Sequence, residues 1–375
     1  MDKNRTSGLL GIMLIALLML NLAGCSQAAL TQAGQKPATQ NGQTADAQRT
    51  ITDMAGRSVK VPVTIKTAFS TSPVAAIMLY ALCPNKMVGW NYDFQPGDKK
   101  FIAPKYQALP NLGGWYAKNT GSTEEILKIH PDVIIDMGDI TKTEMSNADK
   151  IQKQLGIPVV LVQSDPISQM DKACQFLGGL LGEKARAQEL ADYCRQTAAD
   201  VKAKASTIPK DKQVRVYYAE GPKGLQTEPD GSMHIETLNI VGGINVAQGV
   251  QRAGQAGQSP VSMEQVLSWN PDVIMAWGDS QGGYYHKILS DSGWKDIKAV
   301  QQHRVYQIPT APFNWFDRPP SVNRIIGFKW LGNLLYPDIF NYNMVSEVKR
   351  FYGLFYHYNL TDDEAKALLA QPTGN

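Results

Sequence analysis

Residues 123–139 read TEEILKIHPDVIIDMGD, and residues 263–279 read MEQVLSWNPDVIMAWGD. Glu124 matches Glu264 at a constant offset, and Leu127 matches Leu267, followed in both stretches by Pro-Asp-Val-Ile. Each copy predicts a short helix, a Pro-Asp turn and a buried β-branched strand that ends near a glycine. An apolar strand flanked by helices is typical of a parallel sheet covered on both faces. The repeat therefore predicts two related α/β lobes.

The segments around the repeat support this division into an N-terminal lobe (51–166) and a C-terminal lobe (207–375). Short β-branched or aromatic runs predict strands, and longer runs with helical spacing predict helices. The expected strands are residues 64–69, 86–90, 157–162, 214–218 and 305–308. The expected helices are residues 74–82, 148–155 and 236–241.

Residues 167–206 lack proline and are rich in Ala, Gln, Leu, Lys and Glu, which predicts a long helix linking the lobes. The glycines at 178, 179 and 182 are the place where it would break. On one continuous helix Cys174 and Cys194 would lie about 30 Å apart, too far to form a disulfide. We expect these two cysteines and Cys83 to be buried as small apolar side chains.

The first 24 residues have the features of an export signal. Lys3 and Arg5 precede an apolar stretch from residue 9 to 22. This stretch is too short to span a bilayer, which requires about 20 apolar residues. It ends in Leu-Ala-Gly-Cys, which resembles the bacterial lipobox and implies that Cys25 carries a lipid. Residues 25–50 are poor in aromatics and predict a flexible tether. We therefore expect an extracytoplasmic protein that meets a membrane through its lipid anchor only.

Composition excludes several classes of function. The formal net charge is +3, and no basic run suggests a nucleic-acid partner. The sequence holds no GxSxG, HExxH or P-loop motif, and no GxGxxG follows a predicted strand. We therefore expect no catalytic residues, no cofactor and no metal site of the protein's own.

The two repeated segments resemble a motif of the helical-backbone class of periplasmic binding proteins, which serves iron-siderophore, haem and cobalamin importers. Residues 51–62 (ITDMAGRSVKVP), 238–247 (LNIVGGINVA) and 316–338 are similar to further signatures of that family. The resemblance implies two Rossmann-like lobes with parallel-sheet cores, joined by one long helix, with a ligand cleft between them. It also implies an ABC permease dimer and its ATPase as partners, with Glu124 and Glu264 docking on permease arginines. The alternative role for each glutamate is to complement a helix dipole.

Ligands of open α/β lobes bind beyond the carboxyl ends of the strands. The residues in those places are rich in aromatics, which suit a flat or bulky ligand, and include one arginine that can donate to ligand oxygens. The predicted ligand contacts are Trp90, Tyr92, Trp115, Tyr116, Tyr218, Trp277, Tyr284, Tyr285, Trp315 and Arg318. Each aromatic could instead belong to the core, and Arg318 could pair with Asp317. Contacts from His234 or His286 remain open.

These observations predict a substrate-binding lipoprotein that captures a chelated metal compound, with an iron-siderophore as the first choice. Cobalamin, haem or an oxyanion such as molybdate are alternatives within the same class. A metal chelatase-like enzyme and an adhesin or signalling lipoprotein are the alternatives from other classes.

Overall fold

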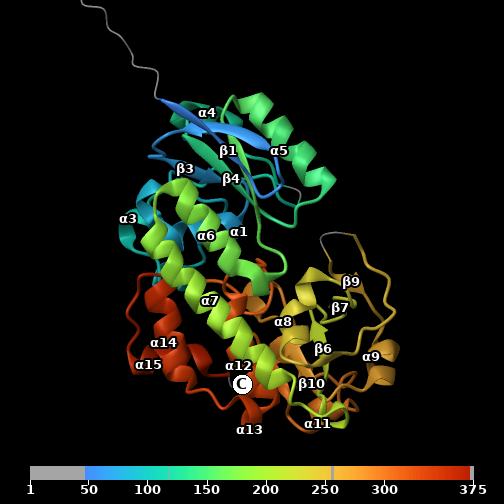
Figure 1. Cartoon of the computed structure of the whole chain (residues 1–375). Helices are drawn as coiled ribbons and strands as arrows, with labels where there is room; N and C mark the ends of the chain where they lie inside the picture. Colours follow the sequence, from blue (N-terminus) through green and yellow to red (C-terminus); the bar gives the residue numbers. More distant parts are fainter. Residues whose placement is uncertain (1–46, 118, 255–256, 372–375) are drawn as a thin grey trace, which may run out of the picture. The chain divides into compact units, whose positions relative to one another are not determined.

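The structure is a computed structural model that describes residues 47–117, 119–254 and 257–371 (Figure 1). The predicted signal peptide, the predicted lipid attachment at Cys25 and all but the last four residues of the predicted tether lie outside the described residues. Within the described ranges, no helix is long and apolar enough to cross a membrane.

The first lobe has a three-stranded parallel sheet in the order β3-β4-β5. Its strands are β3 (Ala68–Ser70), β4 (Val133–Gly138) and β5 (Val159–Gln163), and its longer helices are α1 (Pro73–Leu82) and α5 (Lys142–Leu155). The strands β3 and β4 and both helices overlap the predicted segments. The side chains of the three strands are almost all buried, as the continuous apolar runs predicted.

Two details of this lobe differ from the sequence predictions. Residues 86–90 do not form a strand: a 3-10 turn (Pro84–Lys86) is followed only by single bridges at Met87 and Trp90. A proline begins this turn, and the chain then passes the sheet edge without a ladder. The antiparallel pair β1 (Gln48–Thr52) and β2 (Ser58–Pro62) begins three residues inside the predicted tether.

The second lobe has a four-stranded parallel sheet in the order β11-β10-β6-β8. Its strands are β6 (Arg215–Ala219), β8 (Ile244–Asn245), β10 (Val273–Ala276) and β11 (Val305–Gln307). The helix α8 (Glu236–Ile240) precedes β8, and a small antiparallel pair, β7 (Gln226–Thr227) and β9 (Ser259–Pro260), lies beside β6. The prediction of two α/β lobes with parallel-sheet cores is confirmed.

The repeated Pro-Asp turn has the same structural role in both lobes. The Asp132 carboxylate accepts hydrogen bonds from the backbone N–H groups of Lys66 (2.6 Å) and Thr67 (2.9 Å), just before β3. The Asp272 carboxylate accepts a hydrogen bond from the N–H of Arg215 (3.0 Å), at the start of β6. Each aspartate thus holds the start of the strand that pairs with its own strand. A structural requirement therefore explains why this dipeptide is repeated.

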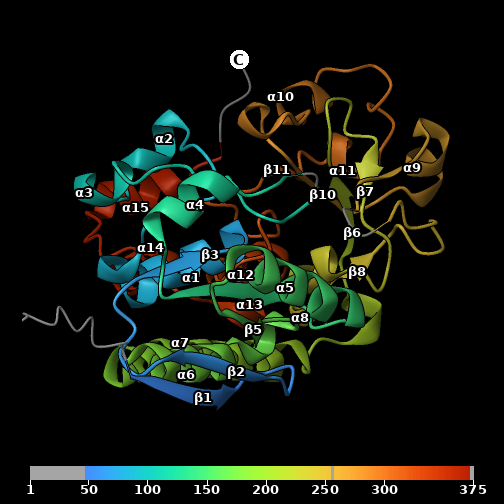
Figure 2. The same ribbon diagram turned by 90° about the horizontal axis from the view of Figure 1, so that it is seen from above.

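The predicted linking helix is two helices, α6 (Met170–Leu181) and α7 (Lys184–Ala205), which lie side by side (Figures 1 and 2). The chain reverses at Gly182, whose φ of +78° favours glycine. Close packing follows at Gly178, where an added Cβ would lie 2.2 Å from the Cβ of Ala187. Only α7, with 22 residues, is the long helix, and it contacts both α1 and α8.

The reversal also corrects the prediction for Cys174 and Cys194. The two thiols interact with each other in the core, where the Cys174 thiol also donates to Met78 Sδ, rather than lying far apart on one helix. The pKa of Cys194 is raised well above its ordinary value, mainly by burial and secondly by the interaction with Cys174. All three cysteines in the described residues are buried, as predicted.

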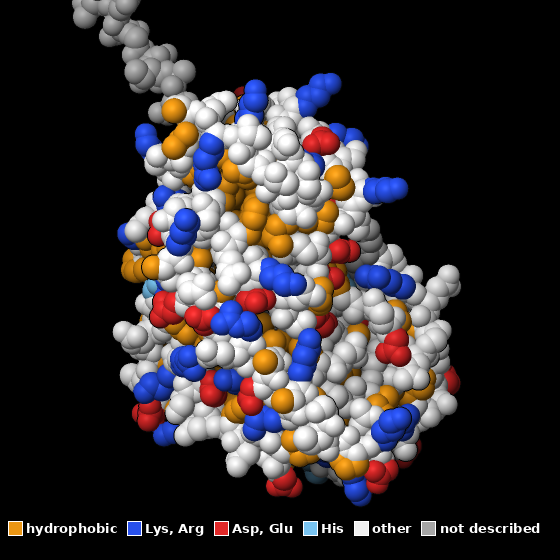
Figure 3. Space-filling view, in the orientation of Figure 1, with side chains coloured by type: hydrophobic (Ala, Val, Ile, Leu, Met, Phe, Trp, Pro, Cys, Tyr) orange, Lys and Arg blue, Asp and Glu red, His pale blue; other side chains and the backbone are white. Residues whose placement is uncertain are grey.

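The C-terminal helices α12 (Arg324–Leu335), α13 (Pro337–Phe340), α14 (Met344–Phe355) and α15 (Asp362–Leu369) do not belong to the second lobe alone. The ring of Phe101 in the first lobe lies 5.1 Å from that of Tyr352 on α14, and Lys100 pairs with Glu364 on α15 at 2.9 Å. One apolar core cluster runs through both lobes and these helices. On the face shown in Figure 3, basic and acidic side chains are interspersed over the lower part of the view.

Candidate functional site

A buried cluster of charges lies at the carboxyl ends of β6 and β10. The Nε of Arg318 donates to Oε1 of Glu220 at 2.8 Å, and its Nη2 donates to Oε1 of Glu228. Its Nε also lies 3.2 Å from Oδ2 of Asp317. The three carboxylates are fully buried, whereas 22% of the arginine side chain is exposed. Arg318 is therefore already paired within the protein, which is the alternative that the sequence left open.

Two of the predicted aromatic contacts belong to this cluster. The guanidinium of Arg318 lies over the ring of Trp277, 5.6 Å from its centroid. The Nε1 of Trp277 donates a 2.7 Å hydrogen bond to the hydroxyl of Tyr218. Tyr218 is fully buried, and its ring lies 4.6 Å from that of Phe316. The parallel pairing of β6 with β10 places residues 218 and 277 near one another.

The cluster includes residues that the site prediction did not contain. His234 Nδ1 lies 2.6 Å from Oδ1 of Asp317, so its ring takes part in the buried network. Glu228 accepts hydrogen bonds from Ser232 Oγ and from the backbone N–H of Gln258, both at 2.8 Å. Glu228 follows a two-residue strand in a loop, and no spacing in the sequence indicates that it meets Arg318.

The electrostatics follow from three carboxylates that share one guanidinium. Burial raises the pKa of Glu220 to about 8, although Arg318 opposes the shift. The Oε2 of Glu220 is buried without a hydrogen-bond partner among the described residues. Burial opposes the charged form of Arg318, but Asp317 and Glu220 outweigh it and raise the arginine pKa. The carboxylates thus already neutralise the positive charge that a bound anion would need.

In the first lobe, Asn91 organises the loop that carries Trp115 and Tyr116. The side-chain oxygen of Asn91 accepts a hydrogen bond from Ser70 Oγ (2.7 Å), and its Nδ2 donates to the carbonyl of Gly113 (2.6 Å). The backbone carbonyl of Asn91 accepts from the Tyr116 hydroxyl (2.8 Å). A Cβ on Gly114 would lie 2.2 Å from the carbonyl oxygen of Thr71, so the loop needs glycine there. Trp115 and Tyr116 both remain partly exposed beside the end of β3.

An aromatic contact joins the two lobes at Tyr92. Its ring lies 5.5 Å from that of Phe313, which the chain contributes after β11. The Tyr92 hydroxyl is buried and has no hydrogen-bond partner among the described residues. Burial is the main cause that raises the pKa of Tyr92 well above its ordinary value. The structure thus places a phenol without a hydrogen-bond partner where the two halves of the predicted cleft meet.

Four predicted contacts lie elsewhere. Trp90 is in the core and donates from Nε1 to the carbonyl of Tyr106 at 2.7 Å. Trp315 is also in the core, against Trp330 and Tyr352. On and before α10 (Tyr285–Ile288), Tyr285 is buried, and the Tyr284 hydroxyl donates to Asp291 at 2.7 Å.

The other open histidine does not join a cluster of ligating groups. His286 Nδ1 lies 3.9 Å from the exposed Asp279 carboxylate. Across the described parts of the chain, no group of three or more His, Cys, Asp or Glu side chains is arranged to hold a metal ion.

Glu124 and Glu264 are both exposed in the first turn of short helices, α4 (Thr123–Ile129) and α9 (Met263–Trp269). Hydrogen bonds lower the pKa of the Glu264 carboxyl: the one from its own backbone N–H contributes most, and the one from the Ser262 side chain comes second. In Figure 2, both helices lie in the half of the view away from α6 and α7. The two glutamates thus occupy equivalent places on the two lobes.

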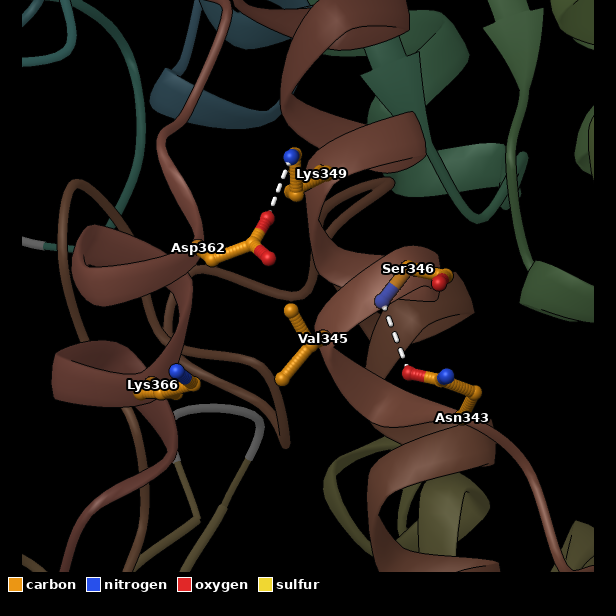
Figure 4. Close-up of a pocket in the computed structure, with 6 residues that line it drawn as sticks. All are labelled: Asn343, Val345, Ser346, Lys349, Asp362 and Lys366. Carbon is orange, nitrogen blue, oxygen red and sulfur yellow. Dashed lines mark hydrogen bonds and ion pairs between the residues drawn. The ribbon is translucent and has the colours of Figure 1, made fainter.

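A hollow of about 480 Å³ lies between α14 and α15, and its lining contains none of the predicted site residues (Figure 4). Lys349 Nζ pairs with Asp362 there, and the Asn343 side chain accepts from the N–H of Ser346. The lining consists of Asn343, Val345, Ser346, Lys349, Asp362 and Lys366.

Comparison with known proteins places the chain among transport proteins. Residues 99–312 match the family described as "Periplasmic binding protein". The chain is 26% identical to the uncharacterized ABC transporter substrate-binding lipoprotein YvrC of Bacillus subtilis, over 90% of this chain and 99% of that protein. It is 25% identical to the molybdate-binding protein MolA of Haemophilus influenzae, over 85% and 94%. Among solved structures, an ABC transporter solute binding protein from Sulfurospirillum deleyianum superposes with a TM-score of 0.79 at 33% identity, covering 85% of this chain and 98% of that one.

Proposed function

The chain belongs to the periplasmic binding protein family, and we propose that it is the substrate-binding subunit of an ABC importer. We infer that it is extracytoplasmic and anchored by a lipid. Its cargo is a chelated metal compound, with an iron-siderophore as the first candidate. It captures and releases this cargo in stoichiometric amounts and does not convert it. Its partners are the permease dimer and the ATPase. Cobalamin and haem belong to the same class of chelated cargo.

The pairing of Arg318 is the observation that carries the choice of cargo. An anion receptor needs a donor or a cation that is free to bind the ligand. Arg318 is the only cation in the predicted ligand set, and three buried carboxylates already bind it. The partly exposed rings of Trp115 and Tyr116 offer apolar contact with polar edges instead. This arrangement suits a bulky complex that carries its metal inside an organic ligand.

Molybdate is the second candidate, because MolA is similar to this chain over most of its length. A tetrahedral oxyanion would have to draw Arg318 away from Glu220 and Glu228, or bind elsewhere on backbone N–H groups. The two cargo classes therefore make opposite demands on Arg318.

Intrinsic tryptophan fluorescence distinguishes these cargoes. We would titrate the mature chain, carrying Cys25→Ser so that it stays unacylated, with ferric siderophores, haem, cobalamin and molybdate. Saturable quenching by a ferric siderophore at sub-micromolar concentration is the expected result. Saturation by molybdate alone would reject the chelate proposal and leave the importer role, whereas turnover of any added tetrapyrrole would indicate an enzyme.

The proposed docking role of Glu124 and Glu264 is tested by charge reversal. Glu124→Arg together with Glu264→Arg is expected to abolish cargo uptake by the assembled importer and to leave cargo binding intact, because both side chains are exposed and lie outside the charge cluster. Unchanged uptake would remove the docking assignment and leave the helix-dipole role.

A further inference from the structure

The two glutamate-bearing helices share a second exposed feature. Among the described residues, the large apolar side chains that are exposed are Val63, Leu127, Leu267 and Leu289. Two of these occupy equivalent positions of the repeat: Leu127 is 41% exposed and Leu267 is 37% exposed. Each follows its glutamate by three residues, so exposed leucines occur at the same place in both lobes.

The equivalence is structural and does not depend on the alignment alone. The pattern of exposure is identical from residue 122 to 130 and from residue 262 to 270. Both helices have seven residues, and both end at a residue with left-handed backbone, His130 (φ 51°) and Asn270 (φ 44°). Within each helix the fully buried side chain is the one between the glutamate and the leucine, Ile126 or Val266.

Helix geometry places each glutamate and its leucine on one face. Residues three apart are neighbours on a helix surface, so Glu124 lies beside Leu127 and Glu264 beside Leu267. The helix dipole explains a glutamate in the first turn, but it gives no reason for an exposed leucine. A single exposed leucine is ordinary. The same carboxylate–leucine pair, outward-facing in both lobes, calls for a common partner.

We propose, building on the importer role above, that Leu127 and Leu267 are the apolar halves of two equivalent docking points for the permease dimer. A surface that occurs twice on one chain is matched by a partner whose own surface occurs twice, as in a two-fold symmetric dimer. Each permease subunit then presents a cationic side chain to the glutamate and an adjacent apolar pocket to the leucine.

The two halves of a docking point have different kinetic effects. The glutamates steer the encounter and make association depend on salt. The leucines lose water only in the docked complex, so they slow dissociation. Both helices lie on the side of the view away from α6 and α7 (Figure 2).

The test compares three variants of the full chain by surface plasmon resonance against the permease–ATPase complex of the same cell, held in nanodiscs. Leu127→Ser with Leu267→Ser is expected to raise the dissociation rate at least about tenfold at an unchanged association rate. Glu124→Gln with Glu264→Gln is expected to lower the association rate and its salt dependence. Leu289→Ser is the matched control, because this leucine is 42% exposed but lies outside the two helices; it should behave as the wild type.

The outcomes separate this proposal from the proposed function. Wild-type dissociation of the leucine variant, with impaired association of the glutamate variant, would overturn the leucine proposal and keep the docking glutamates. Wild-type kinetics of both variants would overturn both assignments. An equal effect of Leu289→Ser would show general loss of apolar surface and reject the leucine proposal. Unchanged thermal unfolding of each variant verifies that the surface substitutions leave the fold intact.

Discussion

The Nε of Arg318 donates a 2.8 Å hydrogen bond to Oε1 of Glu220, at a point where one guanidinium serves three fully buried carboxylates. Glu220 comes directly after β6, while Arg318 lies beyond β11 and next to Asp317. Because the protein pairs this arginine internally, the cluster fixes the carboxyl end of the second sheet before any cargo arrives. It also makes the stability of the second lobe depend on pH.

Glu220→Gln should weaken that pH dependence. Burial raises the pKa of Glu220 from 4.5 to about 8, so between these values the folded chain keeps a proton that the unfolded chain releases. The stability from this group is complete below pH 4.5 and is lost as pH rises through about 8, at up to about 1.4 kcal/mol per pH unit. Glutamine resembles the protonated form, so the variant should gain Tm over the wild type as the pH is raised.

Thermal unfolding followed by circular dichroism, from about pH 5 to about pH 8, measures this difference. The exposed Glu125→Gln is the control, and its profile should run parallel to that of the wild type. Parallel profiles for Glu220→Gln as well would show that this carboxyl is ionised in the folded protein.

Arg318→Met should destabilise the protein by about 3–5 kcal/mol, because it leaves the buried carboxyl groups of Glu220, Glu228 and Asp317 without their cation. The stability of Arg318→Lys should lie between those of the wild type and the methionine variant, since lysine keeps the charge but lacks the planar fork that reaches two carboxylates. Chemical denaturation measures both free energies of unfolding. A methionine variant as stable as the wild type would contradict the ion pairs described above.

Gly178→Ala should destabilise the α6–α7 pair by about 1–3 kcal/mol, because the new methyl group would clash with Ala187. The neighbouring Gly179 is the matched control: it is exposed, and an added Cβ there meets no atom within 4 Å. Gly179→Ala should be neutral or should stabilise the helix by up to about 1 kcal/mol. Equal effects in urea denaturation would mean that the helices do not pack through Gly178.

Asp132→Ala and Asp272→Ala should each destabilise the protein, by about 1.5–3 kcal/mol, because each carboxylate binds backbone N–H groups at the start of a strand. We expect the larger loss for Asp132, which binds two of them. The exposed Asp93→Ala is the control in the same denaturation series. If neither repeat variant differs from this control, the repeated turn has no structural role.

Cys174 and Cys194 should form a disulfide when the protein is refolded in a glutathione redox buffer, because their thiols are in contact. Mass spectrometry should detect the linked peptides, with Cys83 left as a thiol. A single helix through both residues would hold them about 30 Å apart and give no such link. Mixed pairing that includes Cys83 would also contradict the described packing.

The repeat at 123–139 and 263–279 was sufficient to predict two parallel-sheet lobes, because its information is local. A Pro-Asp turn and a β-branched run specify the same unit wherever they occur. The burial of the three cysteines in the described residues also followed from local pattern, and the exposure of Glu124 and Glu264 agrees with the docking role that the family resemblance implies.

What the sequence could not specify are the contacts between segments distant in the chain. In the sequence, the glycines at 178, 179 and 182 indicate only where one helix would break. In the structure, the chain reverses at Gly182, and Gly178 packs against Ala187 so that two helices lie side by side. Trp90 and Trp315 were predicted to contact the ligand because they lie near expected strands, but the core covers them.

Glu228 meets Arg318 only because the strands β6 and β7 and the segment after β11 converge. The exposure of Leu127 and Leu267 likewise depends on which neighbours cover each helix. Sequence thus determined the two lobes and their repeated helix–turn–strand unit, because short-range preferences govern these. Tertiary structure alone decided which charges are paired and which apolar side chains are left exposed, because burial depends on residues far apart in the chain.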